Sequence, residues 1–126
     1  MKRCWFGFAL LLILLAGGLL ATRGMEKIHG ALSQTLETAA EAALREDWHG
    51  AQAAFEKARA EWEKWWHFSA ALADHEPMEE IDSLFAQGEV CLRLGAGEEL
   101  GLVCVQLARQ IRAMGDAHAC TWWNLL

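Results

Sequence analysis

Residues 4–21 read CWFGFALLLILLAGGLLA, and this run governs the interpretation of the rest of the chain. With Thr22 it holds no Asp, Glu, Lys, Arg or Pro, and its length approaches the ~20 residues that an α-helix needs to cross a bilayer. Residues 4–22 are therefore predicted to be a transmembrane anchor. Residues 1–3 would then be cytoplasmic, and residues 25–126 would form one helical domain outside the cytoplasm.

The charges that flank the run favour one orientation. Lys2 and Arg3 precede it, whereas Arg23 and Lys27 on the other side are partly offset by Glu26. Because cytoplasmic flanks carry an excess of Lys and Arg, the N-terminus is predicted to lie inside the cell. We therefore expect a single-pass protein of the cell membrane.

A cleaved signal peptide is the rival interpretation of this run. Such a peptide combines a basic start, an apolar stretch of about 7 to 15 residues and a small-x-small cleavage site. Ala21 could precede a cut, but Leu19 stands where a small residue is expected, and the apolar run continues past Gly18. Both interpretations place the bulk of the chain outside the cytoplasm.

Apolar residues recur at a spacing of three and four in the remaining chain, which is typical of amphipathic helices. Helices are predicted over residues 25–46, 51–72, 78–94 and 98–114, with a short helix or tail over 117–126. Breaks are expected at 47–50, before Pro77, at 95–97 and at 115–116. The predicted fold is all-α: an N-terminal transmembrane helix followed by an antiparallel four-helix bundle. Gly24 and Gly30 leave open whether the anchor joins the first bundle helix as one rod or through a bend.

The expected core consists of the apolar and small residues on one face of each segment. They are Ile28, Leu32, Leu36, Ala39, Ala43 and Leu44; Ala51, Ala54, Phe55, Ala58, Trp62, Trp65, Trp66, Ser69 and Leu72; Ile81, Leu84, Phe85, Gly88, Cys91 and Leu92; and Leu100, Val103, Cys104, Leu107, Ile111 and Met114.

Aromatic residues are the most unusual feature of the domain, and they form the candidate site. Trp62, Trp65 and Trp66 share a helix face with the expected core, so their indoles would contribute several kcal/mol by burial. A binding groove or a membrane-facing patch is the alternative. The full set that could form either a core cluster or an interaction surface is Trp62, Trp65, Trp66, Phe68, Trp122 and Trp123.

The acidic charge balance and the spacing of the histidines and other reactive side chains argue against nucleic-acid binding, metal binding and catalysis. The chain has 17 Asp and Glu against 11 Lys and Arg, with the basic residues scattered, which argues against binding to nucleic acid. The five histidines lack the close helical spacing of metal ligands, and no catalytic constellation is visible. We expect no metal, no cofactor and no enzymatic activity. Cys91, Cys104 and Cys120 are expected to be core thiols; if the domain faces an oxidising space, Cys91 with Cys104 is the most plausible disulfide pair.

One ordered set of residues resembles a known group of proteins. The segment Trp62-Glu-Lys-Trp-Trp-His-Phe-Ser69, the turn Asp74-His75-Glu76, the pair Ile81-Asp82 and the later His118 and Asn124-Leu125 follow one another in this order. The pattern is similar to an uncharacterised family of short, membrane-anchored helical proteins from spore-forming Gram-positive bacteria. The resemblance covers the chain from about Ala51 onward and implies a topology without an activity.

These observations predict that the protein acts by binding another molecule rather than by catalysing a reaction. We expect a membrane-anchored extracytoplasmic helical domain that binds an unknown envelope protein, as an interaction or accessory subunit. The alternative is a bundle that binds a small ligand or lipid in a Trp-lined pocket. Filled ring packing around Trp62, Trp66, Phe55 and Phe85 would favour the first, and an apolar cavity there would favour the second.

Overall fold

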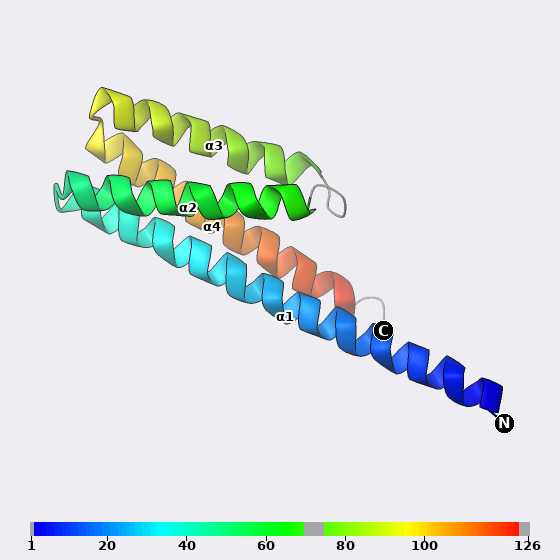
Figure 1. Ribbon diagram of the computed structural model, residues 1–126. Helices are drawn as coiled ribbons and strands as arrows, with labels where there is room; N and C mark the ends of the chain where they lie inside the picture. The colour runs from blue at the N-terminus through cyan, green and yellow to red at the C-terminus, as the bar shows by residue number, and fades with distance from the viewer. Residues whose placement is uncertain (1, 70–74, 124–126) are drawn as a thin grey trace.

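The protein is built from four long helices (Figure 1). The computed structural model describes residues 2–69 and 75–123, without the side chains of residues 2, 3, 22, 68, 69, 75 and 118–123. The helices are α1 (Lys2–Leu44), α2 (Trp48–Ser69), α3 (His75–Leu94) and α4 (Gly97–Trp123), and every element in the described ranges is an α-helix. The predicted all-α class and the packing of four helices are therefore confirmed.

α1 runs without a break from the apolar run into the bundle, which settles the choice that the sequence left open. Gly24 and Gly30 both lie inside the helix. Each glycine costs about 1 kcal/mol relative to alanine, but extending an existing helix adds one hydrogen bond per residue, whereas restarting one requires a new nucleus. The apolar run and the first bundle helix therefore form one rod.

The turn between α1 and α2 is shorter than predicted and lies earlier. The amide of Asp47 donates to the carbonyl of Ala42 (2.9 Å) and that of Glu46 to Ala43 (3.2 Å), while Glu46 has a φ of 60°. These are the bonds of a Schellman C-cap. The Asp47 carboxylate then accepts from the Gly50 amide (3.0 Å), so Asp47 is the N-cap of α2. The predicted break at 47–50 is wrong for this reason: residues from Trp48 onward already belong to α2.

α3 and α4 are joined by two residues, one fewer than α1 and α2, in a turn with a similar cap. Gly95 has a φ of 66°, and the amide of Ala96 donates to the carbonyl of Cys91 (3.0 Å), which confirms the predicted glycine C-cap. Gly97 is not part of the turn, because it is the first residue of α4. α3 begins at His75, before the predicted start at Met78, with Pro77 in its first turn, where no amide donor is needed.

α4 continues through the predicted break at residues 115–116. A Cβ at Gly115 would lie 3.5 Å from the imidazole of His29, so α4 stays helical here and packs closely on α1. The predicted separate helix after 116 is therefore wrong as far as Trp123, and residues 124–126 lie outside the described part of the chain.

Side-chain size sets the spacing between the helices. α1 lies between α2 and α4 and packs closely on both, and α3 packs on α4. Small side chains make the close approach to α4: a Cβ at Gly101 would lie 3.8 Å from both the Ala40 carbonyl oxygen and the Ala43 methyl group. α2 and α3 stay farther apart, because the rings of Phe55, Trp62 and Phe85 occupy the space between them. One side of the bundle is consequently open.

The buried face of α1 differs from the predicted face at its edges. Ile28 and Leu44 are 43% and 74% exposed, so their placement in the core is wrong. Each lies eight residues from the fully buried Leu36, or about 80° around the helix at 3.6 residues per turn. His29 and Ser33 are buried instead. The Ser33 hydroxyl donates to the Gly30 carbonyl (3.1 Å), which satisfies its polar group.

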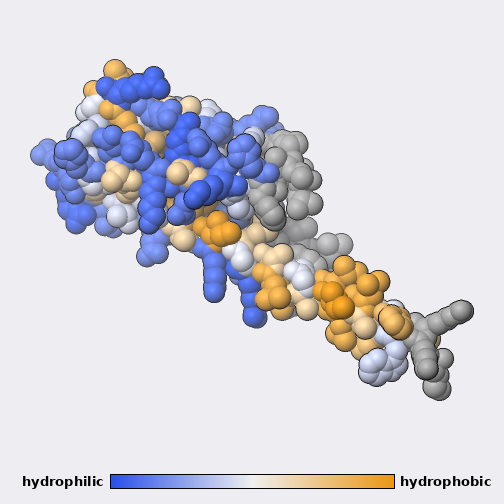
Figure 2. Space-filling model, viewed as in Figure 1, coloured by the Kyte–Doolittle hydropathy of each residue, from blue (hydrophilic) through white to orange (hydrophobic). Residues whose placement is uncertain are grey.

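The apolar half of α1 projects beyond the bundle (Figures 1 and 2). Every residue from Cys4 to Gly17 is exposed, and none of the most apolar window of this helix is buried. In Figure 2 this projection is hydrophobic, while the visible bundle face is largely hydrophilic. α1 is thus long and apolar enough to span a membrane, and its apolar part is not a core helix of the bundle.

Candidate functional site

The aromatic cluster of α2 divides between the core and its margin. Trp62 and Trp65 are buried, and Trp66 is half-buried against the core. The side chains of Phe68, Trp122 and Trp123 lie outside the described residues. Of the predicted site residues, the structure therefore brings three together, and two of these are core residues rather than surface.

Trp62 is the centre of this cluster. Its ring lies 5.4 Å from Trp65, 6.4 Å from Trp66 and 6.1 Å from Phe85 of α3, measured between centroids. Phe85 also lies 5.7 Å from Phe55. Such tilted and offset ring pairs contribute beyond their buried area. Among the described residues the Trp62 Nε1 donor has no hydrogen-bond partner, so burial of this indole carries a polar cost.

His29 lies at the end of the bundle from which the apolar half of α1 projects. It is 3% exposed, and its ring meets Trp65 edge to face at 4.9 Å. Gly115 of α4 packs on its other side. His29, Trp65 and Gly115 come from α1, α2 and α4, so their contacts join these three helices at the end of the bundle next to the projecting segment. Sequence periodicity missed His29 because polar side chains are not counted in an apolar stripe.

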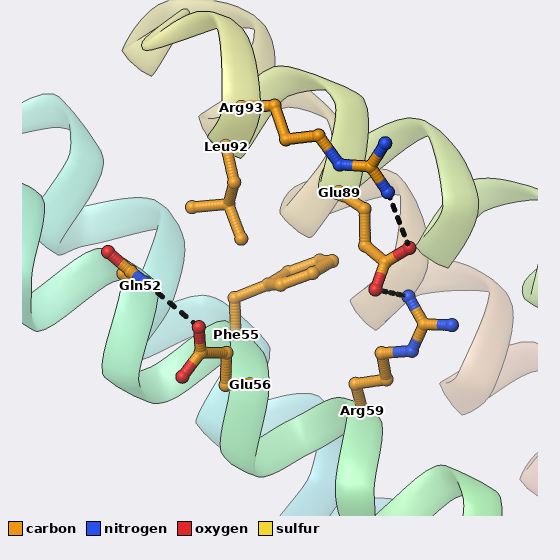
Figure 3. A pocket seen from close by; sticks show the side chains of 7 residues that line it. All are labelled: Gln52, Phe55, Glu56, Arg59, Glu89, Leu92 and Arg93. Carbon is orange, nitrogen blue, oxygen red and sulfur yellow. Dashed lines mark hydrogen bonds and ion pairs between the residues drawn. The ribbon is translucent and has the colours of Figure 1, made fainter.

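A groove of about 340 Å³ opens on the side where α2 and α3 separate (Figure 3). Phe55 and Leu92 supply its apolar surface, and the remaining lining residues are Gln52, Glu56, Arg59, Glu89 and Arg93. Gly88 is required here, because a Cβ at that position would overlap the Phe55 ring. The Phe55 ring at the floor of the groove therefore packs directly on Gly88 of α3.

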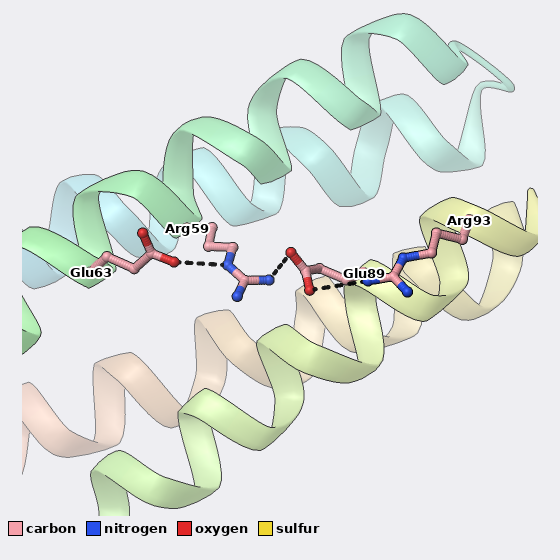
Figure 4. A network of polar contacts seen from close by, with 4 residues as sticks. All are labelled: Arg59, Glu63, Glu89 and Arg93. Atoms are coloured by element: carbon pink, nitrogen blue, oxygen red, sulfur yellow. Dashed lines mark hydrogen bonds and ion pairs between the residues drawn. The ribbon is translucent and has the colours of Figure 1, made fainter.

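A line of charged side chains crosses this groove (Figure 4). Arg59 of α2 pairs with Glu63 on its own helix, with Nε and Oε1 3.1 Å apart, and with Glu89 of α3. The other oxygen of Glu89 lies 3.9 Å from Arg93. The hydrogen bond to Glu89 is the largest influence on Arg59 and raises the pKa of its guanidinium above the usual value. Arg59 is therefore charged at any physiological pH.

These ion pairs position side chains more than they stabilise the fold. The side chains of Glu63 and Arg93 are 60% and 78% exposed, and exposed pairs typically contribute only about 0.2–1 kcal/mol. Gln52 donates to Glu56 across one turn of α2 (2.9 Å) and orders the facing wall. The groove thus combines a small apolar floor with balanced charges, a composition closer to the rim and core of a protein interface than to a closed ligand pocket.

The described residues offer little other chemistry. They contain no group of three His, Cys, Asp or Glu side chains that could hold a metal ion. Cys104 is buried, Cys91 is half-buried, and both are free thiols in the structure. Burial, with a smaller influence from Cys91, raises the pKa of Cys104 to about 12. A thiol with this pKa is protonated at neutral pH and is a poor nucleophile.

Phe55 and Leu92 were predicted to be core residues, whereas the charged residues of the groove were not identified from the sequence. Arg59 and Glu63 have the i, i+4 spacing of a helical ion pair, which is readable from sequence, but the pairing of Arg59 with Glu89 depends on how α2 faces α3. No family model matches the chain, and comparison with curated proteins and with solved structures likewise found no match. The resemblance to short membrane-anchored helical proteins consequently stays a prediction.

Proposed function

We propose that the protein is a single-pass membrane protein whose antiparallel helical bundle binds an envelope protein outside the cytoplasm. One observation carries this proposal: a single uninterrupted helix has an exposed apolar half and a half that is central to the bundle. If the apolar half of α1 belonged to the core of the bundle, its side chains would be buried rather than exposed. The family resemblance noted above agrees with this proposal but adds no activity.

A rigid α1 sets the distance between the groove and the membrane surface. If the bilayer surface lies near Thr22, then Glu37 is about 20–25 Å above it at 1.5 Å per residue. The turn between α1 and α2 is centred on Glu46, so Phe55 is level with Glu37 when the two helices run antiparallel. The groove would therefore meet a partner whose own surface reaches this height.

Packing of the rings favours protein contact over the ligand-binding alternative. Phe55 and Trp62 contact Phe85 from one helix, and Trp66 contacts Trp62. These rings occupy the interior in which a Trp-lined ligand pocket was considered. The groove touches only Phe55 among these rings and is open to solvent along polar walls.

Topology is tested by cysteine labelling in intact cells. Glu41 is exposed on α1, so Glu41→Cys in a background with Cys91→Ala and Cys120→Ala leaves one accessible thiol on the domain beside the buried Cys104, whereas native Cys4 lies on the other side of the apolar run. A membrane-impermeant maleimide is expected to label the Glu41→Cys chain before lysis. Labelling of that thiol only after lysis would place the domain in the cytoplasm and refute the orientation.

Partner binding is tested by photocrosslinking from the groove. A photoreactive amino acid at Gln52, which lines the groove, is compared with the same group at Lys57, which is exposed on α2 outside the groove lining. A discrete protein adduct from position 52 and none from position 57 is expected. Equal adducts from both positions, or none from either, would contradict a partner at the groove.

A further inference from the structure

The end of α4 runs along α1 toward the apolar run. Gly101 lies by Ala40 and Ala43, and Gly115 lies by His29, so α4 advances toward the N-terminal half of α1. Figure 1 shows the last turns of α4 beside α1 at the end from which the apolar segment projects. The closing part of α4 is thus directed at the level where a membrane would begin.

Helix geometry fixes how far α4 reaches. From Gly115 the helix continues to Trp123, which adds about 12 Å at 1.5 Å per residue. The same distance along α1, measured back from His29, leads to Ala21. The backbone at residues 122 and 123 is therefore level with Ala21 and Thr22, where the apolar run of α1 ends.

The chemistry of this end fits a lipid interface. After Asp116 the sequence AHACTWWNLL contains no Asp, Glu, Lys or Arg, and it includes Trp122 and Trp123. Indoles are enriched at the membrane–water boundary, where the ring meets apolar chains and its N–H meets polar groups. On α1, Arg23 and Lys27 are exposed just beyond the apolar run, within reach of lipid phosphates.

We propose that the last two turns of α4, which include the sequence pair Trp122-Trp123, form a second membrane contact at the level of the lipid headgroups of the outer leaflet. This inference rests on the proposed function, because the span of α1 defines the level of the bilayer. Headgroups occupy about 5–7 Å on each side of the hydrocarbon core, so two helices would touch the surface without an intervening linker. The bundle then stands on the membrane in a fixed orientation.

Fluorescence quenching by lipids tests this contact in the full chain. The protein is reconstituted into phosphatidylcholine vesicles with or without lipids brominated near the headgroup. The Trp emission per molecule that is lost to the brominated lipids is compared among the wild type, Trp122→Phe, Trp123→Phe and the double variant. Trp48→Phe is the matched control, because Trp48 begins α2 at the opposite end of the bundle.

The double variant is expected to lose about two-thirds of the lipid-quenched emission, since Trp5 alone would remain at an interface. Trp48→Phe should leave the lipid-quenched emission unchanged. Helical content by circular dichroism identifies a variant that does not fold, and each single variant then supplies an independent test.

Equal lipid quenching in the wild type and in folded single and double variants would overturn the second contact while leaving the anchor intact, because Trp5 still reports it. Absence of lipid quenching in the wild type, with release of the chain by alkaline carbonate, is a different result. That result would remove the anchor and the second contact together.

Discussion

Replacing Trp62 by alanine should destabilise the bundle more than any other single truncation in α2. The ring is 1% exposed and contacts Trp65, Trp66 and Phe85. Truncating a buried aromatic residue to alanine costs about 3–5 kcal/mol, from lost burial and the cavity left behind. The lost free energy of unfolding should lie at the low end of this range, at about 3 kcal/mol. Alanine also removes the buried Nε1 donor, which has no hydrogen-bond partner among the described residues, and this gain offsets part of the loss.

Two matched variants separate ring loss from other effects. Trp62→Phe keeps an aromatic ring and removes the Nε1 donor, so it should cost less than about 1.5 kcal/mol. Trp5→Ala removes an indole that is 77% exposed on the apolar half of α1, and it should leave bundle stability unchanged. Urea unfolding in detergent micelles, followed by circular dichroism at 222 nm, measures all three. A Trp62→Ala free energy of unfolding within about 1 kcal/mol of the wild type would refute the buried placement of this ring.

Other substitutions probe the turns, the open side and the buried thiol. Glu46→Gly should stabilise the protein by about 1 kcal/mol in the same urea assay, because Glu46 has a φ of 60°, which glycine adopts without cost; a loss of stability would contradict the C-cap. Gly88→Ala should cost about 1–3 kcal/mol, because the new methyl group overlaps the Phe55 ring, whereas Gly101→Ala, with contacts at 3.8 Å, should cost much less. The pKa of Cys104 is raised to about 12 from a reference of 9.0, so its contribution is complete below pH 9 and is lost as pH rises toward 12. Urea midpoints at pH 8 and pH 10.5 should therefore differ less in Cys104→Ala than in the wild type, and an equal difference would count against this burial.

Most of the fold could be predicted from short-range patterns in the sequence. The apolar run, the spacing of core residues and the glycine at position 95 correspond to features of α1, the buried faces and the cap of α3. The break at 47–50 was misplaced because Asp47 can either end one helix or cap the next, and only the bonds to Ala42 and Gly50 distinguish the two roles.

Contacts between helices were harder to predict. Gly115 has a low helix propensity, yet it lies inside α4, where the helix packs beside His29 of α1. His29 itself was not expected in the core, since its burial depends on Trp65 from another helix. The groove likewise depends on the ring sizes that hold α2 and α3 apart, and neither helix reveals that distance alone.

The central claim is that α1 remains whole and holds the bundle on a membrane. The most direct test is the intact mass of the chain recovered from carbonate-washed membranes of cells that express it. A mass that includes residues 4–22, found in the membrane fraction, is the predicted result. A chain that begins after Ala21 and is recovered in the carbonate supernatant would contradict the claim and identify residues 4–21 as a cleaved signal.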